Sequence, residues 1–381
     1  MVIDSNGMKK RIIVYGVNYF PAKGGTSTVA ENIIYQLKDK YDFTVYCYNN
    51  VLAADNIPGV KVVQFKPLAK GSLGSLIYFF LSAIHILLFA KGDLVHAHKT
   101  DCAIFLPLLR LRFKIIATSH EAPYKRDKWN SLQKTYFHLA ERIFIKSANI
   151  CTCISEPLSG YYLEKYGKGI YFIPNGINKI DPFAYDMEKT KGFLPDGASV
   201  QQPFILFSAR RLMATKGGHT MLEALHKIKY QGQIFIAGEL EENDYLQKLK
   251  RLSIGLNVFF LGFVTPLNTL LALVNASLLF IFPSETEGMS VMLLEVASVG
   301  KPIVASNIPE NSQIFSADEV LYFQAGNATD LAEKIEFVLS DKEYMGKLGK
   351  KAQERVYASH LWFNIALQYD TLYKKSITGT T

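Results

Sequence analysis

The sequence predicts an α/β protein that contains two doubly wound parallel sheets, one in each half of the chain. Short β-branched and aromatic runs alternate with helical patterns throughout the 381 residues, and a turn-rich stretch at 177–203 separates the halves. This length suits two domains that each have a core. We expect a first domain at 1–180, a linker at 181–203, a second domain at 204–360 and a carboxyl-terminal helix at 361–381 that packs on the first domain.

Strand-like runs mark both sheets. In the first half they lie at 11–16, 43–48, 61–65, 93–98, 114–119, 150–155 and 170–174. In the second half they lie at 204–209, 233–238, 258–263, 278–283 and 302–306. Ligands in open α/β sheets bind beyond the carboxyl ends of the strands, so the loops after these runs are the candidate sites.

Composition excludes several protein classes. A hydrophobic content of 49% and a charged content of 20% describe an ordered globular chain and exclude a disordered or fibrous one. The start MVIDSNGMKKRIIVYG lacks a secretory pattern, which predicts a cytoplasmic protein. Of the four cysteines only Cys151 and Cys153 are close in sequence, and no second Cys or His pair is spaced to complete a zinc site. We expect free thiols and no metal.

Positive charge is concentrated in the first half. Residues 1–170 contain 22 Lys or Arg against 12 Asp or Glu, whereas the remainder contains 20 against 22. Such a basic half could meet nucleic acid, an anionic membrane or a phosphorylated substrate, or it could be a solvated surface without a partner. The apolar run at 76–90 is fifteen residues long, short of the ~20 that a spanning helix needs, so we expect a buried or interfacial helix.

Two glycine-containing loops follow predicted strands, and the first is equally compatible with a plain tight turn. After the first strand, Gly24 and Gly25 permit close backbone approach, and Thr28 with Glu31 has the spacing of a capping box that would open a helix. No dinucleotide fingerprint or P-loop pattern occurs.

The second loop, RRLMATKGG, follows the strand at 204–209. Arg211 and Lys216 flank a loop that leads into a helix, which suits a diphosphate because cations and helix amino termini both attract anions. Alternatively, Arg211 pairs with an acid and Lys216 is solvated.

The stretch PSETEGMSVMLLEVASVGKP contains an apolar helix whose only charged residue is Glu295. An unpaired buried carboxylate is costly, so it must find partners or change its protonation state. Glu287 precedes this helix, and Gly288, Met289 and Ser290 open it with amide groups that face the same ligand. We expect Glu287 and Glu295 to bind hydroxyl groups at separate parts of one extended ligand, with a buried salt bridge as the alternative for Glu295.

The spacing of Glu287 and Glu295 resembles the signature of glycosyltransferase family 4, retaining enzymes with the GT-B fold of two Rossmann-like domains that face each other across a cleft. The resemblance extends over nearly the whole chain, through PAKGGTSTVAEN, DLVHAH, TSHE, IPNGIN, ARRLMATKGG, FIAGEL, FLGF and FNIALQYDTLY. The first half further resembles bacterial transferases that build capsule, O-antigen or exopolysaccharide.

The resemblance implies roles for particular residues. Arg211 and Lys216 would bind the diphosphate of a nucleotide sugar of the UDP, GDP or dTDP type. Glu295 would hold the ribose hydroxyls, and Glu287 would contact the transferred sugar.

In the first domain, the resemblance implies that Gly24 and Gly25 line the donor phosphates and that His120 lies near the sugar. It also implies a metal-independent hexosyltransferase that uses no cofactor besides its donor. Arg210 and Met289 depart from the usual pattern of the family beside the donor site, so the resemblance does not fix the donor.

The expected reaction is transfer with retention of anomeric configuration to a glycan or an undecaprenyl-diphosphate-linked acceptor. The basic residues Arg110, Arg112, Lys114, Lys125, Arg126 and Lys128 could dock with the 76–90 helix on the inner face of the plasma membrane. A sugar phosphorylase of similar architecture is one alternative, although no motif for its pyridoxal phosphate lysine stands out. A glycan- or nucleic-acid-binding module is another, although no RNA- or DNA-binding signature accompanies the charge.

Overall fold

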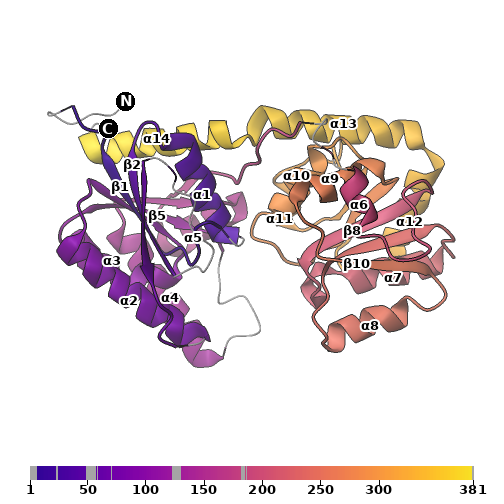
Figure 1. Cartoon of the computed structure of the whole chain (residues 1–381), viewed down its shortest axis with the longest axis horizontal. Helices are drawn as coiled ribbons and strands as arrows, with labels where there is room; N and C mark the ends of the chain where they lie inside the picture. The colour runs from indigo at the N-terminus through magenta and orange to yellow at the C-terminus, as the bar shows by residue number, and fades with distance from the viewer. Residues whose placement is uncertain are drawn as a thin grey trace. The chain divides into compact units, whose positions relative to one another are not determined.

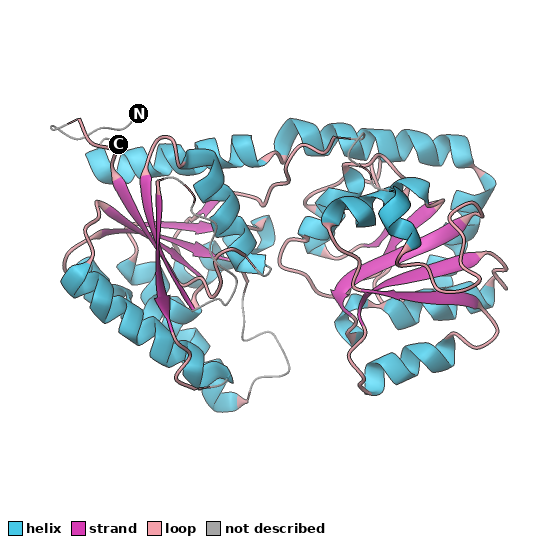
Figure 2. Ribbon diagram, viewed as in Figure 1, coloured by secondary structure: helices cyan, strands magenta, loops and turns pink. Residues whose placement is uncertain are grey.

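The protein is described by a computed structural model that covers residues 7–22, 25–48, 57, 59–69, 71–121, 130–181, 185 and 187–379. The chain divides into two compact units. The first unit consists of Met1–Gly176 together with Trp362–Thr381, and the second consists of Ile177–Leu361. Both are built of helices around a parallel sheet (Figure 1, Figure 2).

The middle of the chain differs from the predicted linker at 181–203. The second unit already begins at Ile177, and Met187–Lys191 forms helix α6, which packs on α9 (Leu267–Ala276) within that unit. The sequence did not predict this short helix, because five residues are too few to show an apolar periodicity.

The first unit contains a seven-stranded parallel sheet in the order β3-β2-β1-β4-β5-β6-β7. All seven predicted strands of this half are present. Their bounds are β1 Arg11–Tyr15, β2 Asp42–Tyr48, β3 Val60–Phe65, β4 Leu94–His98, β5 Lys114–Ser119, β6 Ile150–Cys153 and β7 Tyr171–Phe172.

Helices cover both faces of this sheet (Figure 2). On one face, Ile12 and Val14 pack against α1 (Gly25–Leu37) and α14 (Trp362–Thr378). On the other, the alternate residues Ile13 and Tyr15 pack with the remaining helices, as the two-residue period of a strand requires. These are α2 Gly71–Phe89, the short η1 Asp101–Phe105, α3 Leu106–Arg110, α4 Ser131–Ser147 and α5 Glu156–Tyr166.

Helix α14 is fixed to the first unit by buried polar contacts. The Asp370 carboxylate accepts hydrogen bonds from Lys40 Nζ and Tyr41 Oη, each at 2.7 Å. Tyr373 Oη lies 2.7 Å from His96 Nδ1 on β4. These contacts tie the last helix to the sheet of the first unit.

Two helices of the first unit differ from prediction. Helix α1 begins at Gly25 rather than after Thr28, and the Glu31 carboxylate instead accepts a hydrogen bond from the Ala22 amide at 3.2 Å. Helix α2 begins at Gly71 and has 19 residues, because Gly and Ser residues extend it before the apolar run. Its length and composition would allow it to cross a membrane, as those of some core helices of soluble proteins also would, and 33% of its apolar window is buried inside the protein.

The second unit contains a six-stranded parallel sheet in the order β10-β9-β8-β11-β12-β13. The five predicted strands are present and one short strand, β13, was not predicted. The bounds are β8 Phe204–Arg211, β9 Gln233–Glu239, β10 Asn257–Gly262, β11 Leu279–Phe282, β12 Ile303–Ser306 and β13 Leu321–Phe323.

Helices again cover both faces of the second sheet. One face packs against α7 (Gly218–Lys227), α8 (Asp244–Leu252) and α12 (Ala328–Ser340). Helices α6, α9 and α10 (Val291–Ala297) lie on the opposite face (Figure 1). The remaining helices are η4 Ala214–Lys216, α11 Pro309–Ser312 and α13 Lys342–Ser359.

Each sheet has one point at which the strand order reverses. In the first unit it lies between β1 and β4, and in the second between β8 and β11. Loops that follow two such strands diverge to opposite faces of the sheet and leave a crevice at its carboxyl edge, where ligands bind in doubly wound folds. The two switch points therefore locate the candidate sites.

Candidate functional site

The loops after β8 and β11 touch at the switch point of the second unit. Gly217 has a left-handed backbone with φ of 69°, and a Cβ at this position would lie 2.0 Å from the backbone oxygen of Pro283. The Glu285 amide donates to the Thr215 carbonyl at 2.9 Å. Only glycine fits at 217, and its close contact holds the two loops together.

This contact brings Lys216 and Glu287 together. Lys216 Nζ lies 2.6 Å from Glu287 Oε1, and the Glu287 side chain is 11% exposed. The sequence predicted both residues for one ligand, and the structure shows that they pair with each other. A half-buried pair of this kind presents a cation and a carboxylate side by side, so it can meet an anionic group and a hydroxyl group of the same molecule.

Arg211 ends β8 with an exposed side chain. Its guanidinium makes no hydrogen bond or ion pair with any residue that the structure describes, so the predicted alternative of an acid partner finds no support there. The adjacent Arg210 instead pairs with Glu239, with Nε and Oε1 3.3 Å apart.

Sequence reasoning missed a cavity of about 400 Å³ beside Arg211. Its walls are the ends of β8 and β9 and the start of α8, where the Asn243 side chain caps the helix by accepting from the Leu246 amide at 2.9 Å. The lining residues are Arg211, Leu212, Met213, Ala214, Glu239, Glu241, Asn243, Asp244 and Tyr245. The loop after β9 was the available signal, because it follows a strand next to the switch point.

The predicted apolar helix is α10, which has seven residues. Ser290 caps it by accepting a hydrogen bond from the Leu293 amide at 3.3 Å, with Met289 buried and Gly288 half-buried before it. The carboxylate of Glu295 makes no hydrogen bond or ion pair within the described ranges, and burial raises its pKa to about 7. The predicted alternative, a buried salt bridge to Glu295, is therefore absent among the described residues. The carboxylate of Glu295 keeps its acceptor capacity for a ligand.

His120 belongs to the first unit, at the end of β5. It is buried, and its Nε2 lies 3.2 Å from His98 Nδ1 at the end of β4. Burial lowers the pKa of both imidazoles, that of His98 to about 3. The pair is therefore uncharged at neutral pH, which makes His120 a neutral hydrogen-bonding group.

The remaining predicted residues of the first unit are the two glycines. Gly25 is the first residue of α1, with φ of 41°, and no atom of the described residues lies within 4 Å of a Cβ added there, whereas Gly24 lies outside the described residues. Sequence reasoning also missed Lys99, which directly follows β4 and has a left-handed backbone with φ of 78°.

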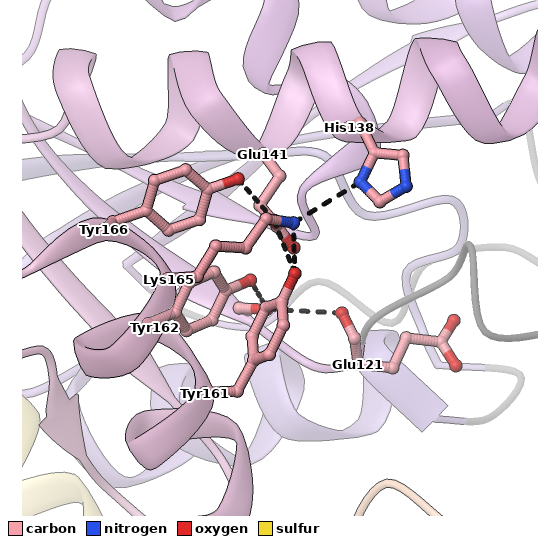
Figure 3. Close-up of polar contacts among 8 residues, drawn as sticks. Glu121, His138, Glu141, Tyr161, Tyr162, Lys165 and Tyr166 are labelled. Atoms are coloured by element: carbon pink, nitrogen blue, oxygen red, sulfur yellow. Dashed lines mark hydrogen bonds and ion pairs between the residues drawn. The ribbon is translucent and has the colours of Figure 1, made fainter.

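A polar cluster around the buried Glu141 links α4 and α5 (Figure 3). One carboxylate oxygen of Glu141 accepts hydrogen bonds from Lys165, Tyr161 and Tyr166, at 2.8, 3.2 and 2.6 Å. Tyr162 Oη lies 2.9 Å from Ser119 Oγ, next to His120 in sequence. The cluster ties both helices to the strand that carries His120, so we assign it a structural role.

No group of three or more His, Cys, Asp or Glu side chains within the described part of the chain is placed to hold a metal ion. Cys151 and Cys153 are free and buried, and burial raises the pKa of their thiols to about 11 and about 12. Such thiols stay protonated and unreactive at neutral pH.

Two family models match the chain. A model described as Glycosyltransferase Family 4 matches residues 23–179, and one described as Glycosyl transferases group 1 matches residues 194–355. Together they span most of both units.

A sequence relative is the N,N'-diacetylbacillosaminyl-diphospho-undecaprenol alpha-1,3-N-acetylgalactosaminyltransferase of Campylobacter jejuni. It is 30% identical over 245 residues, which are 63% of this chain and 60% of that protein. The chain spans 56 to 61% of the length of the first curated relatives that it matches.

Solved structures share the fold. Sucrose-phosphate synthase from Thermosynechococcus elongatus has a TM-score of 0.80 at 20% identity and covers 98% of this chain and 100% of its own. HepE from Anabaena in complex with UDP-glucose has a TM-score of 0.76 at 18% identity, with coverages of 96% and 99%. At these low sequence identities the structural similarity shows a shared fold only.

Proposed function

Because the chain belongs to glycosyltransferase family 4 and has the GT-B fold, we propose that this glycosyltransferase moves a hexosyl group from a nucleotide sugar to a glycan or lipid-diphosphate-linked glycan during synthesis of a bacterial surface polysaccharide. The observation that carries the proposal is the contact between Lys216 and Glu287 at the switch point of the second unit. The Campylobacter jejuni relative is named for an acceptor of this lipid-linked class.

In the proposed reaction, Arg211 and Lys216 bind the donor diphosphate. As the bond between the anomeric carbon and the diphosphate oxygen breaks, negative charge develops on that oxygen, and the two cations stabilise it without reorganisation. These cations supply the charge that a divalent metal supplies elsewhere, so we propose that transfer is independent of metal. Activity that persists in excess EDTA supports this point, and loss that added Mg²⁺ or Mn²⁺ restores contradicts it.

Glu287 and Glu295 serve the neutral parts of the donor in this proposal. Glu287 accepts from a sugar hydroxyl while it remains paired with Lys216, which leaves it poorly suited to attack the anomeric carbon. The acceptor hydroxyl therefore attacks on the face from which the diphosphate departs and gives its proton to the departing oxygen, with retention of configuration. Proton NMR of the first-formed product distinguishes retention from inversion.

The cavity beside Arg211 is large enough for part of a nucleoside, and Glu295 suits the ribose hydroxyls. HepE is titled as a complex with UDP-glucose, which makes UDP sugars the first donors to test. A thermal-shift and hydrolysis screen over UDP, GDP and dTDP sugars tests the proposal, because a ligand of the native state raises the melting temperature. If no nucleotide sugar stabilises or reacts, the proposed function is wrong.

We further propose that the first unit contacts the inner face of the plasma membrane through α2. On the side of α2 away from the sheet, Leu73, Phe80 and Leu88 are 61%, 46% and 60% exposed at spacings that align them on one side. Residues 56–92 and 102–120 contain seven Lys or Arg and no Asp or Glu. An exposed apolar stripe near basic residues suits an anionic lipid surface.

Two of the predicted docking cations also have structural contacts. Arg110 donates to the carbonyls of Lys146 and Ser147 at the end of α4, at 2.9 and 3.1 Å. Arg112 donates to the carbonyl of Leu87 at the end of α2, at 2.5 Å. The predicted residues Lys125, Arg126 and Lys128 lie outside the described residues.

Vesicle co-sedimentation tests the membrane contact. We expect binding to phosphatidylglycerol vesicles that weakens with added salt, and loss of binding in a Phe80→Ser/Leu88→Ser variant. Ile254→Ser, which changes a 76% exposed residue of the second unit, is the matched control. Absence of binding at low salt, or equal binding by both variants, contradicts the proposal.

A further inference from the structure

The switch point of the first unit is held as closely as that of the second. Gly16, at the end of β1, has φ of 87°, and a Cβ there would lie 2.2 Å from the backbone oxygen of His98 and 2.7 Å from Cys102 Sγ. Tyr78 Oη donates to the Val17 carbonyl at 2.7 Å. The loops after β1 and β4 are therefore fixed against each other, and the side chains that they carry have fixed positions.

Lys99 is the first residue of the loop after β4. Its left-handed backbone costs a non-glycine residue roughly 1–2 kcal/mol. The Lys99 amide donates to the Thr118 carbonyl at 3.0 Å, and Nζ donates to Asn18 Oδ1 at 2.6 Å. Strain that the surrounding contacts maintain in this way is typical of ligand-binding positions.

The charge of Lys99 is not matched by an ion pair. Its ammonium group contacts the neutral amide of Asn18 and lies within 4.0 Å of no carboxylate in the described ranges. Burial lowers the pKa of this half-buried lysine, and the charges of Asp101 and Glu121 act in the opposite direction. A cation held beside a neutral partner can gain a strong contact from an anionic ligand.

We propose that Lys99 and Asn18 form a binding site for a phosphate group of the acceptor. The Lys99 ammonium binds the phosphate oxygens, and the Asn18 amide nitrogen supplies a second donor. The neutral His98 and His120 pair lies beside this site, and Cys102 Sγ and the Lys99 carbonyl are 3.4 Å apart beneath it. The inference rests on the proposed function, because it identifies the acceptor as a phosphate-bearing one. A purely structural Lys99 would only tether the loop after β1.

Calorimetric titration with inorganic pyrophosphate tests the site in the full chain. The background carries Arg211→Ala and Lys216→Ala, which remove the proposed anion site of the second unit. We expect the remaining affinity to fall at least about tenfold in Lys99→Asn, since Asn tolerates the left-handed backbone without supplying charge. Asn18→Asp should weaken binding similarly because it gives Lys99 a carboxylate partner, whereas Lys99→Arg should retain binding within about threefold.

Lys91→Asn is the matched control, because Lys91 is an exposed lysine of the same unit. It should bind pyrophosphate as the background does. A background that does not bind pyrophosphate, or equal affinity in Lys99→Asn and Lys91→Asn, overturns the proposal.

Two further ligands show whether Lys99 binds the acceptor or the donor. They also distinguish a failure of this inference from a failure of the proposed function. In the chain with a native second unit, Lys99→Asn should leave the thermal shift by UDP-glucose unchanged and weaken binding of farnesyl diphosphate at least about tenfold. Loss of the UDP-glucose shift would instead assign Lys99 to the donor and overturn the acceptor site. Failure of every nucleotide sugar to bind the native chain would contradict the proposed function, while the pyrophosphate result would still report on Lys99.

Discussion

The two switch points repeat one construction in two unrelated stretches of sequence. In each, a left-handed glycine lies so close to an opposing backbone oxygen that no side chain fits. Gly16 meets His98 in the first unit, and Gly217 meets Pro283 in the second. The fold thus demands the same local geometry wherever two loops diverge from adjacent parallel strands.

The difference between the switch points lies in the partner of a lysine. Lys216 pairs with the carboxylate of Glu287, whereas Lys99 contacts the amide of Asn18. The first arrangement is nearly neutral and offers an acceptor beside a donor, which suits a sugar diphosphate. The second leaves the lysine without a paired carboxylate in the described ranges, which suits a phosphate alone. The fold sets the position of each lysine, and we expect the neighbouring side chain to decide which ligand it favours.

The largest expected effect is on catalysis by the second switch point. Lys216→Ala should lower the transfer rate about 10²- to 10³-fold, because it removes a cation from the departing diphosphate and leaves Glu287 as an unbalanced charge. Steady-state kinetics with the donor identified by screening measures the loss. Lys250→Ala, at a lysine of α8 that pairs with exposed Glu242, should stay near wild type. Equal activity of the two variants would remove Lys216 from the site.

The next largest effect is on stability, and it tests whether the close contacts of Gly16 and Gly217 contribute equally. Gly16→Ala and Gly217→Ala should each lower the free energy of unfolding by about 3 kcal/mol or more, since each combines backbone strain with a steric clash. Gly167→Ala, where φ is 62° and nothing lies within 4 Å of the added Cβ, should cost only about 1 kcal/mol. Urea denaturation measures all three. If Gly167→Ala lowered the free energy of unfolding as much as either switch-point variant, the close backbone approach would not be the cause of the loss.

Local sequence predicted the long strands but not the short strand β13 or the start of α1. Runs such as FILFSA and QIFIAG predicted strands because buried parallel strands need continuous apolar residues. Strand β13 escaped because its three residues carry no period. The start of α1 was misplaced because Glu31 has capping-box spacing but bonds to Ala22 instead.

The site was predictable in its residues but not in their pairing. Lys216 and Glu287 were assigned to loops after separate strands, and only the order of strands in the sheet makes β8 and β11 neighbours. Lys99 was missed because nothing in its local sequence reveals a positive φ or its place at a switch point. Long-range topology, rather than local pattern, carries this information.

Within the second unit, Glu295 contrasts with Glu287 because no cation pairs with it in the described ranges. Its pKa is raised to about 7 by burial. An ionised carboxylate accepts hydrogen bonds from ribose hydroxyls more strongly than a protonated one, so affinity for UDP-glucose should increase by up to about tenfold between about pH 6 and 8. UDP-glucose is a suitable probe because its diphosphate does not titrate there. Glu295→Gln should abolish this pH dependence, and an unchanged pH profile in Glu295→Gln would contradict the role.

The same shift predicts how stability depends on pH. The pKa of Glu295 in the folded state, about 7, lies above its ordinary value of 4.5. The folded state therefore binds the proton more tightly, and the contribution of this group to stability falls as pH rises from 4.5 through 7. Urea denaturation of the ligand-free chain across this range, with Glu295→Gln as reference, measures the contribution. A difference between the two chains that does not vary with pH would show that folding does not shift the pKa of Glu295.

The smallest effect concerns the strain at Lys99. Lys99→Gly removes a left-handed lysine, so it should raise the free energy of unfolding by up to about 1 kcal/mol while it lowers the affinity for pyrophosphate. Lys229 also has a positive φ, 50°, but lies in a turn after α7. Lys229→Gly should therefore give a similar gain in stability without loss of pyrophosphate affinity. If Lys99→Gly kept full affinity for pyrophosphate, the left-handed backbone at Lys99 would serve the loop after β4 rather than a ligand, and the proposed phosphate site would be wrong.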